Sequence, residues 1–388
     1  MTPVTHDPRD AMTPVTHDPR DAMTWRQTRA WLNEHRWELA ARAADLYPDA
    51  PRVAGTALLA KTEWLPSEPV PLKAIRLEWS ERPAGWAVTG DEAAPFGVTA
   101  GFPRYSDAMR ELTSPRVFHN RMCYALRGIG DSMVFGPAQY FANIDIGEAV
   151  AHEYARAVRS GETDLPLRRA IGDPLDLSRR PLPVAISTLV LRQDRDGPRM
   201  LLHWRDPAKV AMNGGLYQVA PVGVFQPSDD AEWNLRNDFD LWRSIQREMH
   251  EELLGGSEDY GSDTRPIDYA GWEFARKLDA AREIGDIAVD WLGAGIDPLT
   301  LVCDLLCRVT FASHAFDDVF EQDVFEQDVF EKVVGANDEG TLSAIPFTAE
   351  TVRRYPIQPA GAALLRLAAR SLSLSQCQTR PESPQEGH

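Results

Sequence analysis

Apolar and polar positions alternate along the first half of the chain in a way that predicts both helices and extended segments. Residues 25–46 carry apolar side chains at helical spacing, which predicts one amphipathic helix that ends at residues 49–51. The same spacing predicts a helix over residues 146–160. Proline-bounded runs at residues 53–64 and 72–79 predict extended segments. We therefore expect a mixed α/β unit, to which the pattern assigns no chemistry.

The pattern changes after the polar, proline-bounded segment 173–181, which we take as a domain boundary. Apolar runs rich in β-branched residues predict strands, and helical spacing predicts helices. The predicted strands cover residues 184–191, 200–204, 216–225 and 301–311, and the predicted helices cover residues 238–254 and 359–372. The fold class that we expect is α/β (α+β), with a layered C-terminal domain behind a mixed α/β N-terminal one.

Both ends of the chain are polar. Residues 1–11 read MTPVTHDPRDA, and residues 12–22 repeat them letter for letter. Such a composition offers too few apolar side chains to offset the entropy lost on ordering, so we expect residues 1–22 to be a disordered leader. We expect an N-terminal domain over residues 23–180, a C-terminal domain over 181–374 and a disordered tail over 375–388. A five-residue tandem duplication begins at Val319 and receives no functional assignment.

Composition and charge narrow the classes of partner. The formal net charge is −17, and the hydrophobic share of 43% is that of an ordinary globular protein. An acidic chain is a poor binder of nucleic acid, and an anionic substrate would need cations to offset the field. A helix-turn-helix DNA reader over residues 25–59 is disfavoured because Pro48, Pro51 and Gly55 would interrupt its second helix.

Compartment follows from apolar runs and cysteine usage. No run approaches the roughly 20 apolar residues that cross a bilayer, and no basic segment precedes an apolar one, so we expect no membrane association and no secretory signal. The four cysteines are too few and scattered for a disulfide framework. Cys303 and Cys307 have the spacing of half a zinc site, but we interpret them as buried thiols. We expect a cytoplasmic protein.

One predicted helix carries the candidate chemistry. Glu248, Glu251 and Glu252 lie at positions i, i+3 and i+4, so their carboxylates share one stripe of the helix. Like charges stacked in this way repel, and a hard divalent cation such as Mg²⁺ or Mn²⁺ would offset them with oxygen ligands. The alternative is a solvated acidic face. His250 points about 200° away from Glu248 and is expected to face away from such a metal.

The sequence around this helix resembles the Nudix hydrolase family. Arg247, Glu248, Met249, Glu251 and Glu252 match the core of its signature, and Gly223, which follows Pro221, resembles its loop glycine. The stretch from Gly214 to Pro221 also resembles an actinobacterial group of two-domain proteins with a Nudix-like domain. The resemblance covers roughly residues 183–372. It implies an α/β/α sandwich with a mixed sheet, metal ligation by the three glutamates, and bracing of the loop by Arg247.

The loop half of the signature departs from the family pattern. Trp233 and Phe239 stand where the consensus has its glycine and first glutamate, and Leu254 stands in place of the terminal glycine, which follows at Gly255. If Gly223 is the true equivalent, about ten residues are inserted between positions 226 and 237. Asp238 or Asp240 is then a candidate to replace the missing glutamate.

Gly223 is also a candidate for the substrate side of the site, together with several further residues. Nudix enzymes often recruit a carboxylate from a later loop, and Glu339 lies where such a loop is expected, with Asp317 and Asp318 as competitors. Tyr217 and Trp233 are candidates to stack a base, whereas Phe225 is better explained by core packing.

The resemblance implies a divalent-metal-dependent hydrolase that acts on the phosphoanhydride bond of a nucleoside diphosphate linked to another moiety. Two alternatives remain open. In the first, the domain is a catalytically inactive sensor that binds a nucleotide or sugar-nucleotide, which the altered loop favours. In the second, it is an interaction protein with an acidic helix and no metal.

Overall fold

The computed structural model describes residues 18–81, 85–115, 118–205, 216–320, 335–336 and 340–378. It has a mixed α/β fold, as expected from the sequence. Glu339, the first seventeen residues and most of the five-residue duplication lie outside the described residues.

A large mixed sheet forms the centre of the molecule. Its strands are β1 (Val70–Pro71), β5 (Val184–Asp194), β6 (Gly197–Arg205), β7 (Tyr217–Val219), β8 (Val222–Val224), β9 (Ile287–Ile296), β10 (Cys303–Ala312), β11 (Gly335–Ala336) and β12 (Gly340–Pro346). The order is β1-β9-β10-β5-β6-β12-β11, with β7 on β6 and β8 on β5. Among these pairings only β10 with β5 is parallel.

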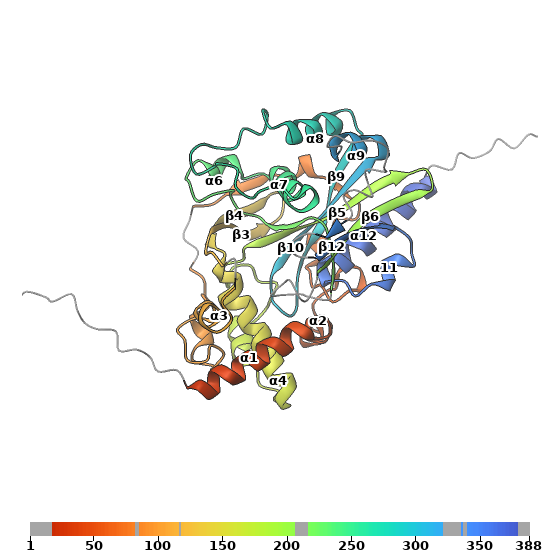
Figure 1. Cartoon of the computed structure of the whole chain (residues 1–388). Helices are drawn as coiled ribbons and strands as arrows, with labels where there is room; N and C mark the ends of the chain where they lie inside the picture. Colours follow the sequence, from red (N-terminus) through yellow and green to blue (C-terminus); the bar gives the residue numbers. More distant parts are fainter. Residues whose placement is uncertain are drawn as a thin grey trace, which may run out of the picture.

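Helices cover both faces of this sheet (Figure 1). On one side lie α7 (Leu241–Leu254), α8 (Glu273–Glu283) and α9 (Ser313–Phe320), and on the other lies α12 (Pro359–Gln378). Most residues of β5 and β10 are buried, as expected for strands that are covered on both faces. The short helices α6 (Asn234–Asn237) and α11 (Thr351–Arg354) lie in the connections.

The N-terminal part contributes helices and a smaller sheet. The helices are α1 (Pro19–Glu34), α2 (Arg36–Ala43), α3 (Tyr105–Thr113), α4 (Ala149–Ser160) and α5 (Pro166–Ile171). The sheet has the order β2-β4-β3, with β2 (Leu77–Trp79), β3 (Met122–Ile129) and β4 (Met133–Gln139). Single turns are η1 (Ala44–Leu46), η2 (Val53–Gly55), η3 (Thr62–Trp64), η4 (Leu72–Ala74) and η5 (Asp91–Ala93), and a wider turn, η6 (Asn143–Glu148), leads into α4.

The two halves share one hydrophobic core. A single cluster of buried side chains runs from Trp25 to Ala368, and β1 completes an edge of the large sheet. The hairpin of β3 and β4 docks on the C-terminal half through the Leu126 amide, which donates to the Leu182 carbonyl at 2.9 Å. The predicted boundary at residue 181 therefore marks where the large sheet begins in the sequence, and the core continues across it.

Several element predictions need correction. The single helix expected over residues 25–46 is divided at His35, and it begins earlier, at Pro19, where Asp18 caps it. Residues 19–22 are therefore helical and do not belong to a disordered leader. Helix α12 likewise continues to Gln378, past the expected start of the tail at residue 375. The segment 53–64, expected to be extended, has a single turn at each of its two ends.

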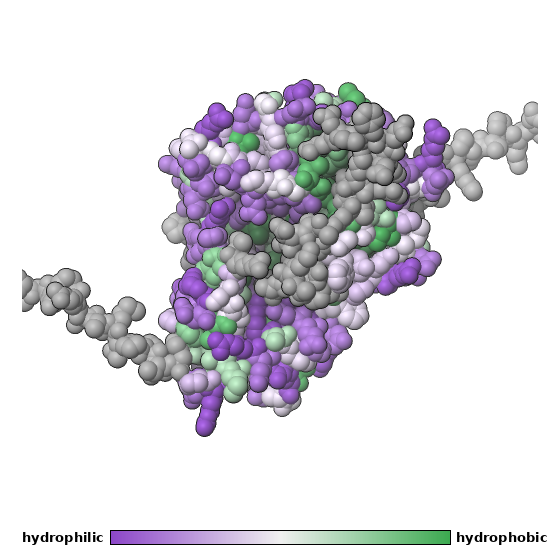
Figure 2. Space-filling view, in the orientation of Figure 1, coloured by the Kyte–Doolittle hydropathy of each residue, from purple (hydrophilic) through white to green (hydrophobic). Residues whose placement is uncertain are grey.

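The face shown in Figure 2 is mostly hydrophilic, and hydrophobic residues appear there in small separate groups. Within the described residues, no helix combines the length and the apolar character needed to span a bilayer.

Candidate metal and substrate site

Helix α7, which carries the predicted carboxylates, is fixed at both ends. The Asp240 carboxylate accepts hydrogen bonds from the Trp242 and Arg243 amides at 2.8 and 3.1 Å, which caps the first turn. Gly255 ends the helix with φ 66°, a left-handed conformation that favours glycine. Ile245 and Met249 are buried on the face that packs against the sheet, so the adjacent stripe with the glutamates is held in a defined direction.

Gly223 makes room for the Glu248 carboxylate. A Cβ atom at position 223 would lie 1.8 Å from Glu248 Cδ, far inside any allowed contact. Gly223 lies in β8. The preceding residue of the same strand, Val222, donates its amide hydrogen to Glu252 Oε1 at 3.0 Å. Strand β8 and helix α7 therefore meet through two of the three predicted carboxylates, and only a glycine permits the closer of these contacts.

The carboxylates are destabilised in their charged form. Burial, together with the negative charges of Glu251 and Glu252, raises the pKa of Glu248 well above its usual range. Burial raises the pKa of Glu251 to about 7, although the Tyr260 hydroxyl donates to its Oε1 at 2.8 Å. Burial and mutual repulsion therefore destabilise the charged forms of these acidic groups, and a bound cation would offset both effects.

Arg247 holds the loop that follows β8. Its Nη2 donates to the Gln226 carbonyl at 2.7 Å, and its Nη1 donates to the Tyr269 hydroxyl at 2.8 Å. Nη1 also lies 3.4 Å from Asp238 Oδ2, and all three side chains of this network are buried. A buried arginine with this set of partners fixes the loop against α7.

The loop between β8 and α7, where the resemblance led us to expect an insertion, contains helix α6. Asp238 accepts from both the amide and the hydroxyl of Ser228, at 2.8 and 2.6 Å, in addition to its contact with Arg247. Of the two aspartates considered in place of the missing glutamate, Asp238 therefore joins the arginine network and Asp240 caps the helix. Trp233 donates from Nε1 to the Ser262 carbonyl at 3.0 Å, which ties the insertion to the segment after α7.

A pocket of about 350 Å³ opens beside the carboxylate stripe. This volume lies in the range of about 300–1,000 Å³ that is usual for small-molecule sites. Its lining contains Gly223, Val224, Gln226, Pro227, Ser228, Arg247, Glu248, Glu251, Glu258 and Tyr260 from the C-terminal half, and His119, Arg121 and Tyr140 from the N-terminal half. His119, Arg121, Tyr140, Glu258 and Tyr260 could not be identified from the sequence, because no local pattern marks residues that only the tertiary fold brings together.

Other sequence candidates lie elsewhere. Tyr217 packs against Tyr355, with ring centroids 4.6 Å apart, and does not line the pocket. Asp317 accepts from Arg192 at 2.9 Å, and Phe225 is fully buried in an aromatic cluster with Tyr124. Of the residues proposed for the substrate side, Gly223 thus borders the pocket, Tyr217 lies away from it, and Glu339 is outside the described residues.

His250 and the paired cysteines have structural surroundings. The His250 ring centre lies 5.1 Å from that of Trp272, and His250 is not among the residues that line the carboxylate pocket, so it faces an aromatic group. Cys303 and Cys307 are buried in β10, and burial raises the pKa of the Cys307 thiol to about 12. Both remain protonated thiols at neutral pH.

The donor set matches a hard divalent cation in chemistry. Carboxylate oxygens are the ligands that Mg²⁺ and Mn²⁺ prefer, and Glu248 and Glu251 reach the pocket. In the described part of the chain, however, no three His, Cys, Asp or Glu side chains are already grouped closely enough to hold an ion. Glu252 is engaged with the Val222 amide. Closure around an ion would therefore require small side-chain movements.

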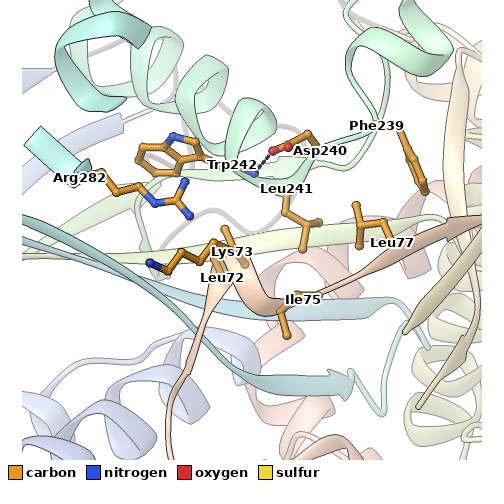
Figure 3. Close-up of a pocket in the computed structure, with 9 residues that line it drawn as sticks. All are labelled: Leu72, Lys73, Ile75, Leu77, Phe239, Asp240, Leu241, Trp242 and Arg282. Atoms are coloured by element: carbon orange, nitrogen blue, oxygen red, sulfur yellow. Dashed lines mark hydrogen bonds between the residues drawn. The ribbon is translucent and has the colours of Figure 1, made fainter. Parts of the chain in front are cut away.

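A second hollow, of about 440 Å³, lies at the opposite end of α7 (Figure 3). Lys73 and Arg282 border it, and the rest of its lining is largely apolar, including Leu72 and Leu241. The Arg282 guanidinium lies 5.2 Å from the centre of the Trp242 ring, and Asp240 is already engaged as the helix cap. This hollow lacks a group of carboxylates, so the carboxylate pocket is the stronger candidate site.

No model of a known protein family matches the chain, and a search of curated proteins finds no match either.

Proposed function

We propose that this protein is a Nudix-type hydrolase that uses Mg²⁺ or Mn²⁺ to cleave the phosphoanhydride bond of a nucleoside diphosphate linked to another group. The observation that carries the proposal is the meeting of Glu248 with Gly223 at the pocket wall. Three carboxylates on one stripe of α7 repel one another, and a bound cation would offset this repulsion. Gly223 leaves the space that lets one of them reach β8.

The chemical step is a hydrolysis. A water oxygen forms a bond to one phosphorus, the bond between that phosphorus and the bridging oxygen breaks, and the bridging oxygen leaves with the other phosphate. Glu248, Glu251 and Glu252 are the residues that would hold the metal. When bound, a divalent cation supplies charge neutralisation for the diphosphate and acidifies a coordinated water.

Residues of the chain would provide the remaining functions. Glu251 lines the pocket and accepts a hydrogen bond from Tyr260, so its carboxylate is placed to accept the proton that the water loses. Arg247 acts by positioning, because its bonds to Gln226 and Tyr269 hold the loop beside α7.

The direct test is a screen of nucleoside diphosphates with different second groups for Mg²⁺-dependent release of phosphate products. We expect one class of these compounds to be turned over, and we expect Glu251→Gln to reduce the rate by at least about 100-fold, as expected for loss of a general base. Glu283→Gln, an exposed residue on α8, is the matched control and is expected to keep the wild-type rate. Absence of turnover with every compound would contradict the proposal.

A catalytically inactive nucleotide sensor is the second candidate. It is favoured by the ordered insertion between β8 and α7 and by the lack, among the described residues, of an assembled group of metal ligands. The same screen separates the two functions. A sensor would bind one of the compounds, and raise the melting temperature of the protein, without releasing product.

A further inference from the structure

The N-terminal half reaches the carboxylate pocket at one place, the open end of the β3–β4 hairpin. Arg121 precedes β3 and Tyr140 follows β4, and the Tyr140 amide donates to the Arg121 carbonyl at 2.8 Å. The Phe141 amide donates to Asn120 Oδ1 at 2.8 Å, which closes this end further. His119, Arg121 and Tyr140 thus leave the hairpin together, and all three line the pocket.

The hairpin is attached to the loop that forms the other side of the pocket. The Tyr124 amide donates to the Phe225 carbonyl at 3.0 Å, and the Cys123 thiol lies 3.5 Å from Gln226 Oε1. Gln226 is the residue whose carbonyl Arg247 holds. The position of Arg121 relative to α7 is therefore set by backbone contacts and does not depend on its own side chain.

The charges on the two sides of the pocket are opposite. Glu248, Glu251 and Glu258 line the α7 side, and the cation on the hairpin side is Arg121. His119 lies on the hairpin side too, and its imidazole N–H can donate a hydrogen bond. Within the described residues, the Arg121 guanidinium makes no hydrogen bond or ion pair. Arg121 acts on Glu251 through its charge alone, without a hydrogen bond or ion pair in the described part of the chain that an added phosphate would have to break. In a chain of net charge −17, a partly buried arginine of this kind at a pocket wall is available to a ligand.

We propose that His119 and Arg121 bind the phosphate groups of the substrate from the side opposite α7, so that the N-terminal half completes the site. Arginine suits this task because its planar guanidinium presents paired donors that match phosphate oxygens. A metal on the α7 carboxylates and the two basic side chains would then contact the same diphosphate from opposite sides. The inference rests on the proposed function for the identity of the ligand, and it gives a role to residues 119–140.

The test measures binding separately from turnover. The probe is α,β-methylene-ADP, a diphosphate whose bridging carbon resists hydrolysis, titrated into the full-length protein in excess Mg²⁺ by calorimetry. We expect Arg121→Gln to weaken binding at least tenfold and Arg121→Lys to restore part of the loss. Arg76→Gln is the control, because Arg76 is exposed and paired with Glu78 at 3.2 Å, and it is expected to bind as the wild type does.

A second readout excludes a merely structural effect. Binding of Mn²⁺ without nucleotide is expected to be no weaker in Arg121→Gln than in the wild type, because the arginine contributes no ligand and its removal lessens repulsion of the cation. Equal binding of the probe by Arg121→Gln and the wild type would overturn the inference, as would a wild type that binds no probe.

The two proposals fail in different ways. If the wild type hydrolyses a nucleoside diphosphate and Arg121→Gln has an unchanged KM, the proposed function stands and the role of Arg121 is wrong. If the probe binds through Arg121 and no compound is hydrolysed, the role of Arg121 stands and the hydrolase function is wrong.

Discussion

At the scale of single residues, the contact between Gly223 and Glu248 links the strand to the helix. The atoms of Glu248 that a methyl group at position 223 would meet belong to its carboxylate, at the end of a flexible side chain. The methyl group would therefore displace the carboxylate with little effect on the stability of the fold. The position of this carboxylate, and not the stability of the protein, is therefore what the glycine protects.

Gly223→Ala is expected to lower turnover by at least about 100-fold, which corresponds to about 2.7 kcal/mol of transition-state stabilisation. Steady-state kinetics and thermal melting measure the two effects side by side. Gly130→Ala is the matched control, since a Cβ there meets no atom within 4 Å. A Gly223→Ala protein with wild-type turnover would show that the contact has no functional role.

The buried ion cluster of the N-terminal half gives a second prediction. Glu148 accepts from Arg36 Nη1 and Nη2 at 3.0 and 2.7 Å and also from Arg29, and all three residues are buried. Glu148→Gln leaves two buried guanidinium groups without a counter-charge, so we expect a loss of about 3–5 kcal/mol in the free energy of unfolding at neutral pH. Urea denaturation measures this, with the exposed Glu111→Gln as control.

The same cluster predicts the pH dependence of that loss. Burial acts to raise the pKa of Glu148, but Arg29 and Arg36 outweigh it and hold the pKa below its usual value of 4.5. The unfolded chain therefore takes up a proton first as the pH falls, and the stabilisation from Glu148 is lost progressively below about pH 4.5. The difference in stability between the wild type and Glu148→Gln should shrink in acid. A difference that grows there would contradict this account.

At the scale of secondary-structure elements, strong local signals were predicted well. Strands β5, β6 and β10 and helices α7 and α12 lie where the hydrophobic pattern placed them, because each buries a regular apolar face. Helix α8 and strand β9 were not predicted from the sequence. Charged residues interrupt the apolar positions of α8, and Asp290, Gly293 and Gly295 weaken the strand pattern of β9. Pairing with β10 and packing on α7 stabilise these two elements.

The candidate site was predicted in part for a similar reason. Glu248 and Arg247 lie on one periodic helix, and Gly223 lies on a short strand beside it, so local spacing was informative. Arg121 and Tyr260 come from segments without periodic signal, and they reach the pocket through non-local contacts. Local spacing carries no information about contacts between segments that lie far apart in the sequence.

Helix α7 owes its start to Asp240, which gives a prediction at this scale. Asp240→Ala removes the acceptor for the Trp242 and Arg243 amides and should cost about 1 kcal/mol of stability, with a fall of roughly 1 °C in the melting temperature. Asp263→Ala, an exposed turn residue, is the control. An unchanged melting temperature in Asp240→Ala would mean that packing alone determines where α7 begins.

At the scale of the whole molecule, the two halves are parts of one structure. The Leu59 amide and the Ile296 amide each donate to the other residue's carbonyl, at 2.9 and 2.7 Å, and the aromatic cluster around Phe225 includes Phe135 from the hairpin. We therefore expect a fragment of residues 181–388 to lack a sharp unfolding transition, because it would expose the apolar surface that the N-terminal half covers. Calorimetry of the fragment and of the full chain tests this. A cooperative transition in the fragment would establish an independent domain.

The central claim is that the α7 carboxylates hold a divalent cation, and a Mn²⁺ titration followed by electron paramagnetic resonance tests it most directly. The signal of free Mn²⁺ should fall on addition of the wild-type protein and persist on addition of Glu248→Gln, while Glu283→Gln behaves as the wild type. If the wild type leaves the free Mn²⁺ signal unchanged, or if Glu248→Gln removes as much of it as the wild type does, the carboxylate stripe is not a metal site.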